Sequence, residues 1–251
     1  MLKIAIIGFG NVGRALAQAV HASPQLELVQ IYNRSAMAAK DYPHITTNDL
    51  SALKPADLYL ISVSDRSVAE VAQALAFENR LVAHTAGSLP AQVLGTRNRS
   101  GVFYPLQTFS KTRAVDFSTV PICIEAAFER DLATLEACAR ALSNQVHVIG
   151  TDARKMLHLS AVFVCNFTNH LYAIAQDLCK QHSLPFSLLE PLIMETALKV
   201  REVPAASAQT GPAIRGDQKV MDAHLALLTN DIHKQIYTLL SGAIQEHGKK
   251  L

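Results

Sequence analysis

The chain begins, after Met1, with Leu2-Lys3-Ile4-Ala5-Ile6-Ile7-Gly8-Phe9-Gly10-Asn11-Val12-Gly13, and this stretch decides the fold. An apolar run rich in β-branched residues predicts a buried parallel strand. The glycines that follow allow a sharp turn and let the backbone approach a pyrophosphate. Residues 11–22 then predict a helix whose N-terminal amides point at that anion. The alternative is a tight turn that binds nothing, but the order strand, glycines, helix favours the phosphate site.

The composition suits a globular protein with no strongly charged surface. The chain has 251 residues, 49% of them hydrophobic, which is enough for one large domain or two modest ones. Its formal net charge is +2, and no run of Lys or Arg exceeds Lys249-Lys250. Charge this weak and dispersed predicts no nucleic-acid partner.

The cysteines and the N-terminus indicate the compartment. Cysteines at positions 123, 138, 165 and 179 form no CxxC pair, which favours free thiols in a reducing compartment and gives no reason to expect a metal. No apolar run reaches the roughly 20 residues that span a membrane. The N-terminus lacks the charged-then-apolar layout of a signal peptide. We therefore expect a cytoplasmic protein with no membrane partner.

The turn after the second strand predicts which dinucleotide is bound. Residues 26–32, Leu-Glu-Leu-Val-Gln-Ile-Tyr, predict this strand, and Asn33-Arg34-Ser35 follow it. In NAD sites an acidic residue about 20 positions after the glycines binds the ribose 2′-hydroxyl. Amide, guanidinium and hydroxyl groups instead bind a 2′-phosphate, which a carboxylate would repel. We predict NADP as the cofactor, the alternative being an ordinary turn with a solvated Arg34.

Two further buried strands, at residues 57–63 and 81–83, lead into polar segments. In open α/β sheets, ligands bind beyond the carboxyl ends of the strands. We therefore expect the nicotinamide and its ribose beside Val63 and Ser64, and beside His84-Thr85-Ala86-Gly87. For His84 a role as a hydrogen-bonding surface residue is the alternative.

Strands and helices alternate up to about residue 150. Further strands are predicted at residues 101–109, 121–125 and 146–149, with a helix at 128–142. Alternating elements with short connections predict an α/β fold, a doubly wound Rossmann-type parallel sheet. We place this cofactor-binding domain at residues 1–150 and an all-α domain at residues 151–251, for substrate binding and dimerisation.

The all-α domain begins with a predicted helix of about 30 residues, from position 152 to 181. At 100° per residue, one narrow polar stripe on it holds Lys155, His158, Asn166 and Asn169. Such a stripe is usually a solvated face. Asn and His, however, are better suited to hydrogen bonding than to solubilising a helix. We favour a stripe that faces a ligand.

Three helix starts are predicted from their caps. Ser67 is expected to cap a helix to about residue 77, Ser187 with Glu190 to open one to about residue 203, and Asp217 to cap the next. The loop before Asp217, residues 209–217, is dense in Gly and Pro. A simple connector explains those residues, but it leaves Thr210 and Arg215 unexplained.

The chain resembles the 6-phosphogluconate dehydrogenase-like superfamily, which includes pyrroline-5-carboxylate and ketopantoate reductases. It is most similar to a bacterial family that joins a Rossmann-like domain to a helical domain of unknown function, with members labelled NADP oxidoreductases. The residues that carry the resemblance are Gly8–Gly13, Asn33-Arg34-Ser35, His84–Gly87, Pro105–Phe109, His158 with Asn166, and Thr210–Asp217. The resemblance spans nearly the whole chain and implies an NADP-dependent oxidoreductase, with a dimer common in the superfamily.

The resemblance also implies catalytic roles. Ketopantoate reductases carry a Lys and Asn residues spaced by fours on the long helix, and the corresponding positions here are His158, Val162 and Asn166. Histidine exchanges protons near neutral pH, so His158 becomes the expected proton donor and Asn166 an orienting donor. Lys155, one turn earlier, is the competing acid.

Substrate contacts are implied in the same way. The Thr210-Gly211-Pro212 loop resembles in position a substrate loop of pyrroline-5-carboxylate reductases, and Arg215 suits a substrate carboxylate. The other expected substrate contacts are Gln107, Thr108 and Asn169. Where the family often has His-Pro, this chain has Tyr104-Pro105, and a phenol still forms hydrogen bonds.

Three functions are compatible with these features. The leading hypothesis is an NADP-dependent oxidoreductase that transfers a hydride to a small 2-oxo acid or cyclic imine and acts as a homodimer. The second is a regulatory protein that binds NADP(H) without catalysis. The third, a methyltransferase, is disfavoured because Asn33-Arg34-Ser35 lacks the acid commonly used for ribose hydroxyls.

Overall fold

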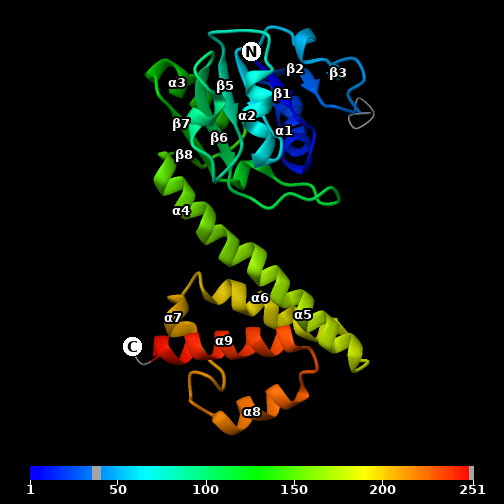
Figure 1. Cartoon of the computed structure of the whole chain (residues 1–251), viewed down its shortest axis with the longest axis vertical. Coiled ribbons are helices and arrows are strands. Elements are labelled where there is room, and N and C mark those ends of the chain that lie inside the picture. Colours follow the sequence, from blue (N-terminus) through cyan, green and yellow to red (C-terminus); the bar gives the residue numbers. More distant parts are fainter. Residues whose placement is uncertain (36–40, 249–251) are drawn as a thin grey trace. The chain divides into compact units, whose positions relative to one another are not determined.

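The computed structural model describes residues 1–35 and 41–248 and divides into two compact units (Figure 1). The first unit is Met1–Asn166 and the second is Phe167–Leu251. The sequence placed a boundary at residue 150, where the strand pattern ends. The first unit extends further because helix α4 (Thr151–Ala161) packs on the sheet, with Arg154 buried and Leu157 against the apolar cluster around Tyr104.

The first unit is built on an eight-stranded sheet in the order β3-β2-β1-β4-β5-β6-β7-β8. The strands are β1 Leu2–Ile7, β2 Leu26–Tyr32, β3 Thr46–Thr47, β4 Leu58–Ile61, β5 Leu81–His84, β6 Arg99–Pro105, β7 Ile122–Ala126 and β8 Val146–Val148. Neighbouring strands are parallel except β6 and β7, which are antiparallel. The α/β Rossmann-type prediction is confirmed, with one correction: the sheet is mostly rather than wholly parallel.

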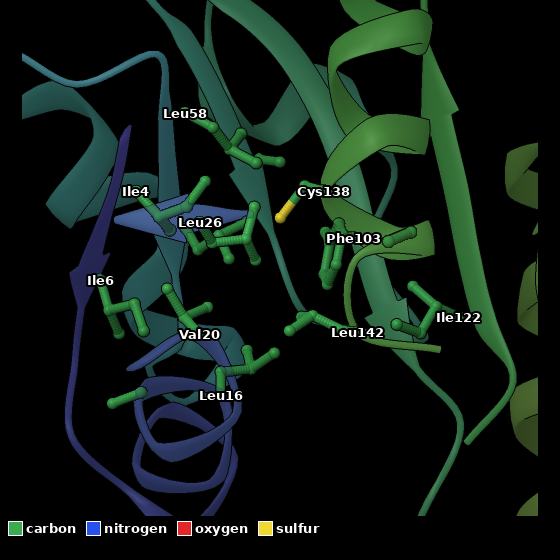
Figure 2. Packing of buried hydrophobic residues seen from close by; sticks show 14 of the residues in the cluster. Ile4, Ile6, Leu16, Val20, Leu26, Leu58, Phe103, Ile122, Cys138 and Leu142 are labelled. Carbon is green, nitrogen blue, oxygen red and sulfur yellow. The ribbon is translucent and has the colours of Figure 1, made fainter. Parts of the chain in front are cut away.

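Helices cover both faces of the sheet. α1 (Asn11–Ala22) and α3 (Glu129–Arg140) contribute Leu16, Val20 and Cys138 to a core with Ile4 and Phe103 (Figure 2). α2 (Val68–Gln73) buries its apolar side in a second cluster on the other face of β1. This is the layering expected when buried parallel strands alternate with amphipathic helices.

The helix α2 departs from its predicted form. Ser67 was expected to cap it, but the Ser67 hydroxyl bonds the Ser64 hydroxyl at 3.0 Å, and its side chain makes no cap. A 3₁₀ turn at Asp65–Ser67 precedes the helix instead. The helix also ends at Gln73, before the predicted residue 77.

In the second unit, the regular structure of the residues up to 248 is helical. Its helices are α5 Thr168–Gln181, α6 Glu190–Lys199, α7 Ala205–Ala208, α8 Gln218–Leu227 and α9 Asp231–Gly248. Asp217 caps α8 as predicted, since the Val220 amide donates to its carboxylate at 3.2 Å. The capping box expected at Ser187 does not form, and a 3₁₀ turn at Phe186–Leu189 leads into α6. Among the described residues, no helix combines the length and apolarity needed to cross a membrane.

The long helix predicted from residue 152 to 181 is present, but its geometry changes midway. α4 continues into a π-helical turn at Val162–Phe167 and then into α5. A π turn has more residues per turn than an α-helix. The even spacing of 100° per residue that defined the polar stripe therefore does not hold beyond Ala161.

Candidate functional site

The glycine-rich turn is tightly enclosed at two of its three glycines. Gly8 has φ +105°, and a Cβ there would lie 2.4 Å from the Ser62 carbonyl oxygen. A Cβ on Gly13 would lie 2.1 Å from the Gly8 carbonyl oxygen, so the helix packs directly on the turn. A Cβ on Gly10 would meet no atom within 4 Å. Gly10 thus presents bare backbone to open space, as a site for a pyrophosphate requires.

A cleft of about 540 Å³ opens beside this turn. It is bordered by the carboxyl ends of β1, β2 and β4 and by the segment after β5. The predicted cofactor residues that line it are Gly8, Phe9, Gly10, Asn11, Val12, Asn33, Arg34, Val63, Ser64, Thr85 and Ala86. The size and the polar rim of this cleft suit a dinucleotide, and its position is the one expected for open α/β sheets.

Asn33 and Arg34 have different parts in this cleft. The Phe9 backbone amide donates to the Asn33 side-chain oxygen at 3.2 Å, and the Asn33 side-chain amide donates to the Ser35 carbonyl at 2.8 Å. Asn33 therefore ties the glycine turn to the segment after β2. Arg34 is exposed on the wall of the cleft. Of the predicted trio, Arg34 is the cation available to a 2′-phosphate.

His84 forms its hydrogen bonds inside the protein. Its side chain is fully buried, the Ala86 amide donates to Nδ1 at 3.2 Å, and Nε2 lies 3.3 Å from the Pro90 carbonyl. Burial, and secondarily the Arg154 charge, lower the pKa of His84 to about 4 against the raising effect of the Pro90 bond. A neutral imidazole with its proton on Nε2 satisfies both bonds. Its ring is not on the cleft wall, so His84 holds the turn that follows it.

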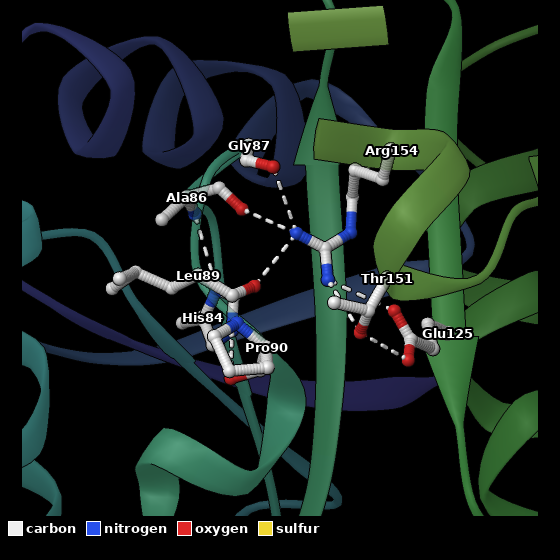
Figure 3. A network of polar contacts seen from close by, with 8 residues as sticks. All are labelled: His84, Ala86, Gly87, Leu89, Pro90, Glu125, Thr151 and Arg154. Atoms are coloured by element: carbon white, nitrogen blue, oxygen red, sulfur yellow. Dashed lines mark hydrogen bonds and ion pairs between the residues drawn. The ribbon is translucent and has the colours of Figure 1, made fainter. Parts of the chain in front are cut away.

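Arg154 fixes the same turn from the other side (Figure 3). Its guanidinium is fully buried, and Nη1 donates to the carbonyls of Ala86, Gly87 and Leu89 at 3.2, 2.9 and 2.7 Å. Nη2 donates to Glu125 Oε2 at 2.9 Å. Arg154 therefore clamps residues 86–89 to α4. Nothing in its sequence surroundings marks it, because its partners are carbonyls of a distant turn.

A tyrosine and a histidine lie against this clamped turn. Tyr104 Oη is 3.0 Å from His158 Nδ1, and a Cβ on Gly87 would lie 2.7 Å from that nitrogen and 2.8 Å from Tyr104 Cζ. Both rings are therefore seated on the backbone of Gly87. Ala86 lines the dinucleotide cleft. The ring of His158 lies on Gly87, the residue that follows Ala86 in the chain.

A second cavity, of about 470 Å³, opens at His158. It is lined by Tyr104, Leu106, Gln107, Thr108, Leu157, His158, Ser160, Ala161, Val162, Val164, Cys165 and Asn166. Four residues singled out from the sequence, Gln107, Thr108, His158 and Asn166, thus line one cavity. Within the described part of the first unit, the residues that line this cavity include no Lys, Arg, Asp or Glu.

Other predicted residues lie elsewhere. Lys155 is exposed and does not line the cavity at His158. Asn169, Thr210 and Arg215 belong to the second unit. There Gly211 and Gly216 adopt φ +106° and +67°, which shapes the loop that carries Thr210 and Arg215. No three His, Cys, Asp or Glu side chains gather as a metal site within residues 1–35 and 41–248.

Comparison with known proteins identifies both halves of the chain. Residues 3–87 match the family described as NADP oxidoreductase, coenzyme F420-dependent, and residues 120–244 match the domain of unknown function DUF2520. No curated protein matches the chain.

Solved structures similar to this one cover almost its whole length. A Bacteroides fragilis protein that carries the provisional name NADP oxidoreductase is 44% identical, with 98% of both chains covered and a TM-score of 0.89. A Thermotoga maritima protein is 20% identical over 98% of this chain and 99% of its own, with a TM-score of 0.79. A reductive aminase from Aspergillus terreus, in complex with NADPH and ethyl levulinate, is 16% identical over 98% and 94%, with a TM-score of 0.72. The Thermotoga maritima and Aspergillus terreus proteins are similar to this chain in fold.

Proposed function

Because the chain belongs to the family that joins an NADP oxidoreductase domain to DUF2520, we propose that it reduces a small carbonyl or imine compound with NADPH. The observation that carries this proposal is the placement of His158. Its ring lies on Gly87, next in the chain to Ala86 on the wall of the dinucleotide cleft. The proposed proton donor and the expected hydride donor would thereby meet at one turn of the chain.

The cleft beside the glycine turn fits the cofactor. Gly10 leaves open space where a pyrophosphate would approach the backbone, and the N-terminus of α1 favours an anion there. Arg34 would pair with the 2′-phosphate. Thr85, together with Ala86, which Arg154 and His84 hold, would border the nicotinamide. When bound, NADPH supplies a hydride, while the protein supplies position and a proton.

His158 Nε2 is the proposed proton donor. With Nδ1 bound to Tyr104, Nε2 is the ring nitrogen left to face a substrate in the cavity. As an imidazolium, the ring would give its Nε2 proton to the carbonyl oxygen or imine nitrogen as the neighbouring carbon accepts the hydride, which would leave a neutral ring with its hydrogen on Nδ1. Asn166 lines the same cavity and would orient that polar atom by hydrogen bonding. Lys155 does not line this cavity, and it would have to reach the cavity to act as the competing donor.

The proposed substrate class rests on the cavity at His158. Uncharged side chains line the cavity at His158, which suits the reacting carbon of a small 2-oxo acid or cyclic imine. A substrate carboxylate would need a cation from elsewhere. For the second unit, Arg215, which is exposed beside Thr210, and Asn169 stay sequence-based predictions of substrate contacts.

We also propose that the protein is a homodimer. The second unit exposes large apolar side chains, including Leu188 at 68%, Leu192 at 61% and Leu239 at 74%. Soluble monomers rarely leave large apolar patches uncovered. Light scattering should give twice the chain mass of 27.3 kDa. A mass equal to one chain at micromolar concentration would contradict the dimer.

Binding and turnover test the function in sequence. NADPH should bind at micromolar protein concentration, and NADH more weakly. NADPH oxidation with a panel of 2-oxo acids and cyclic imines should then reveal a substrate, and His158→Ala should lower kcat about 100-fold or more. His224→Ala, a histidine of the second unit that also pairs with a tyrosine, is the matched control. NADPH binding with no turnover across the panel would favour the regulatory alternative.

A further inference from the structure

Tyr104 reaches His158 in a way that the proposed proton transfer does not by itself require. The rings meet edge to face, with centroids 5.9 Å apart and an interplanar angle of 74°. This geometry brings the Tyr104 hydroxyl to 3.0 Å from Nδ1. The contact therefore selects one of the two ring nitrogens and leaves the other free to act.

The tyrosine is more deeply buried than the histidine. Tyr104 lies on β6 opposite Cys123 of β7 and is 9% exposed, in a small apolar cluster. On its other side, Gly87 leaves room for the aromatic ring because it has no Cβ. The Gly87 carbonyl is itself fixed by Arg154 at 2.9 Å. Tyr104 is thus a fixed point against which the ring of His158 can be oriented.

Burial is the main reason that the Tyr104 hydroxyl stays protonated. Burial raises the pKa of Tyr104 to about 12, and Cys123 of β7 and Asp65 after β4 act in the same direction. Arg154 of α4 acts against them. The phenol is therefore the neutral form at neutral pH and has a hydrogen to donate.

A hydroxyl group suits a partner that changes protonation state. It accepts from Nδ1–H in the cation and in the neutral ring left after Nε2 gives up its proton, and it donates to Nδ1 in the resting neutral ring whose hydrogen is on Nε2. A carbonyl or carboxylate partner can only accept, and an ammonium can only donate. The same Tyr104 oxygen can therefore keep the imidazole in one orientation before and after it gives up a proton.

We propose that Tyr104 is a positioning residue that orients His158 and, in the resting neutral ring, directs the hydrogen to Nε2. The proposal rests on the function above, in which Nε2 faces the substrate. It adds a requirement that can be measured without a substrate: the neutral ring must carry hydrogen on Nε2 and accept a bond at Nδ1. The proton donor is then a Tyr–His pair rather than a lone histidine.

Nitrogen NMR of the full-length protein tests this directly. Ring ¹⁵N signals of His158 would be assigned by their absence from the spectrum of His158→Gln. In the wild type above pH 8, we expect Nε2 to carry the hydrogen and Nδ1 to show the shift of a hydrogen-bonded acceptor. In Tyr104→Phe, Nδ1 should move to the position of a free acceptor. A neutral wild-type ring with its hydrogen on Nδ1 overturns the proposal, even if the variant does not fold.

Kinetics provide the second arm, once a substrate is known. Tyr104→Phe should lower kcat about tenfold, the order expected for one hydrogen bond, with the Kd for NADPH unchanged. In a His158→Ala background the same change should have almost no effect, because the group it orients is gone. Additive losses in the double variant would contradict an action through His158.

The second unit offers a matched control. Tyr237 Oη lies 2.9 Å from His224 Nδ1, with rings 5.8 Å apart at 88°, so Tyr237→Phe removes a similar bond. It should leave kcat and the His158 signals unchanged. If no compound in the panel is reduced, the proposed function fails, whereas the ring-nitrogen spectra still decide whether Tyr104 orients His158.

Discussion

Arg154 and Glu125 form an ion pair of 2.9 Å in which the guanidinium is fully buried and the carboxylate side chain is 20% exposed. Thr151 joins them, since its hydroxyl donates to Glu125 Oε1 at 2.7 Å. Nη2 also donates to the Thr151 hydroxyl at 3.3 Å, and Nη1 donates to backbone carbonyls of the turn after β5. Nε is buried without a partner among the described atoms. The buried guanidinium of Arg154, whose counterion is Glu125, therefore mainly holds α4 to this turn.

Arg154→Met should destabilise the protein by about 3 kcal/mol. The change leaves three carbonyls and the Glu125 carboxylate without their shared donor. Urea unfolding would measure it. Arg97→Met removes the pair with Glu78, whose side chains are 50% and 65% exposed, and should cost less than about 1 kcal/mol. Equal losses in the two variants would mean that the buried arginine does not hold the turn.

Gly10→Ala should abolish tight NADPH binding without unfolding the protein. A Cβ at Gly10 touches no protein atom, so the added methyl group fills only the space proposed for the pyrophosphate. We expect the Kd for NADPH to rise at least about tenfold. Gly150→Ala, at an equally open position before α4, should bind as the wild type does. Fluorescence titration and thermal melting together distinguish lost binding from lost folding.

Arg34→Ala should remove the preference for NADPH over NADH. A charge-assisted hydrogen bond contributes about 1.5–3 kcal/mol, so the Kd for NADPH should rise about 10- to 100-fold while that for NADH hardly changes. Arg66→Ala is the control, because Arg66 is also an exposed arginine but does not line the cleft. If both variants keep the wild-type preference, the 2′-phosphate is bound by other residues.

His84 should make stability depend on pH in mildly acidic solution. Its pKa falls from an ordinary 6.5 to about 4 on folding, so between these values the unfolded chain binds more protons. Stability therefore decreases as pH falls from 6.5 to 4, by up to about 3 kcal/mol. His84→Asn cannot take up this proton. The difference in unfolding free energy between wild type and variant should shrink as pH falls, and a constant difference would refute this account.

Gly87→Ala should impair turnover through His158. The new methyl group would lie 2.7 Å from Nδ1 and 2.8 Å from Tyr104 Cζ, so the two rings must move apart. Displacement of a catalytic group by about 1 Å can cost about 100-fold in rate. We expect kcat to be about 10- to 100-fold lower, together with altered His158 ring signals. Unchanged kcat would separate this contact from catalysis.

Elements with strong local signals could be predicted from the sequence. The helix at Asn11–Ala22 and the strand at Leu26–Tyr32 have the predicted bounds, because their hydrophobic periodicity and flanking residues agree. The direction of β7 could not be predicted. A buried strand shows the same apolar run whichever way it pairs, so Ile122–Ala126 carried no sign of its antiparallel register with β6.

The candidate site was predictable where residue type and spacing coincide. Gln107, Thr108, His158 and Asn166 line one cavity, although the regular spacing used for the helix ends before Asn166, in the π turn. Arg154 could not be found in this way. A single arginine on a helix is usually solvated, and its burial depends on carbonyls brought to it by tertiary structure.

Each carbonyl that accepts from Arg154 belongs to a planar trans peptide, and the described residues include no cis bond. In such a peptide the N–H points opposite to the C=O. The amides of Gly87 and Ser88, which share peptides with the carbonyls of Ala86 and Gly87, therefore point away from the guanidinium. The fixed positive charge of Arg154 thus orients the dipoles of two peptide groups in this turn. Electron-rich atoms on the far side of the turn would experience an attractive field without a cation having to approach them.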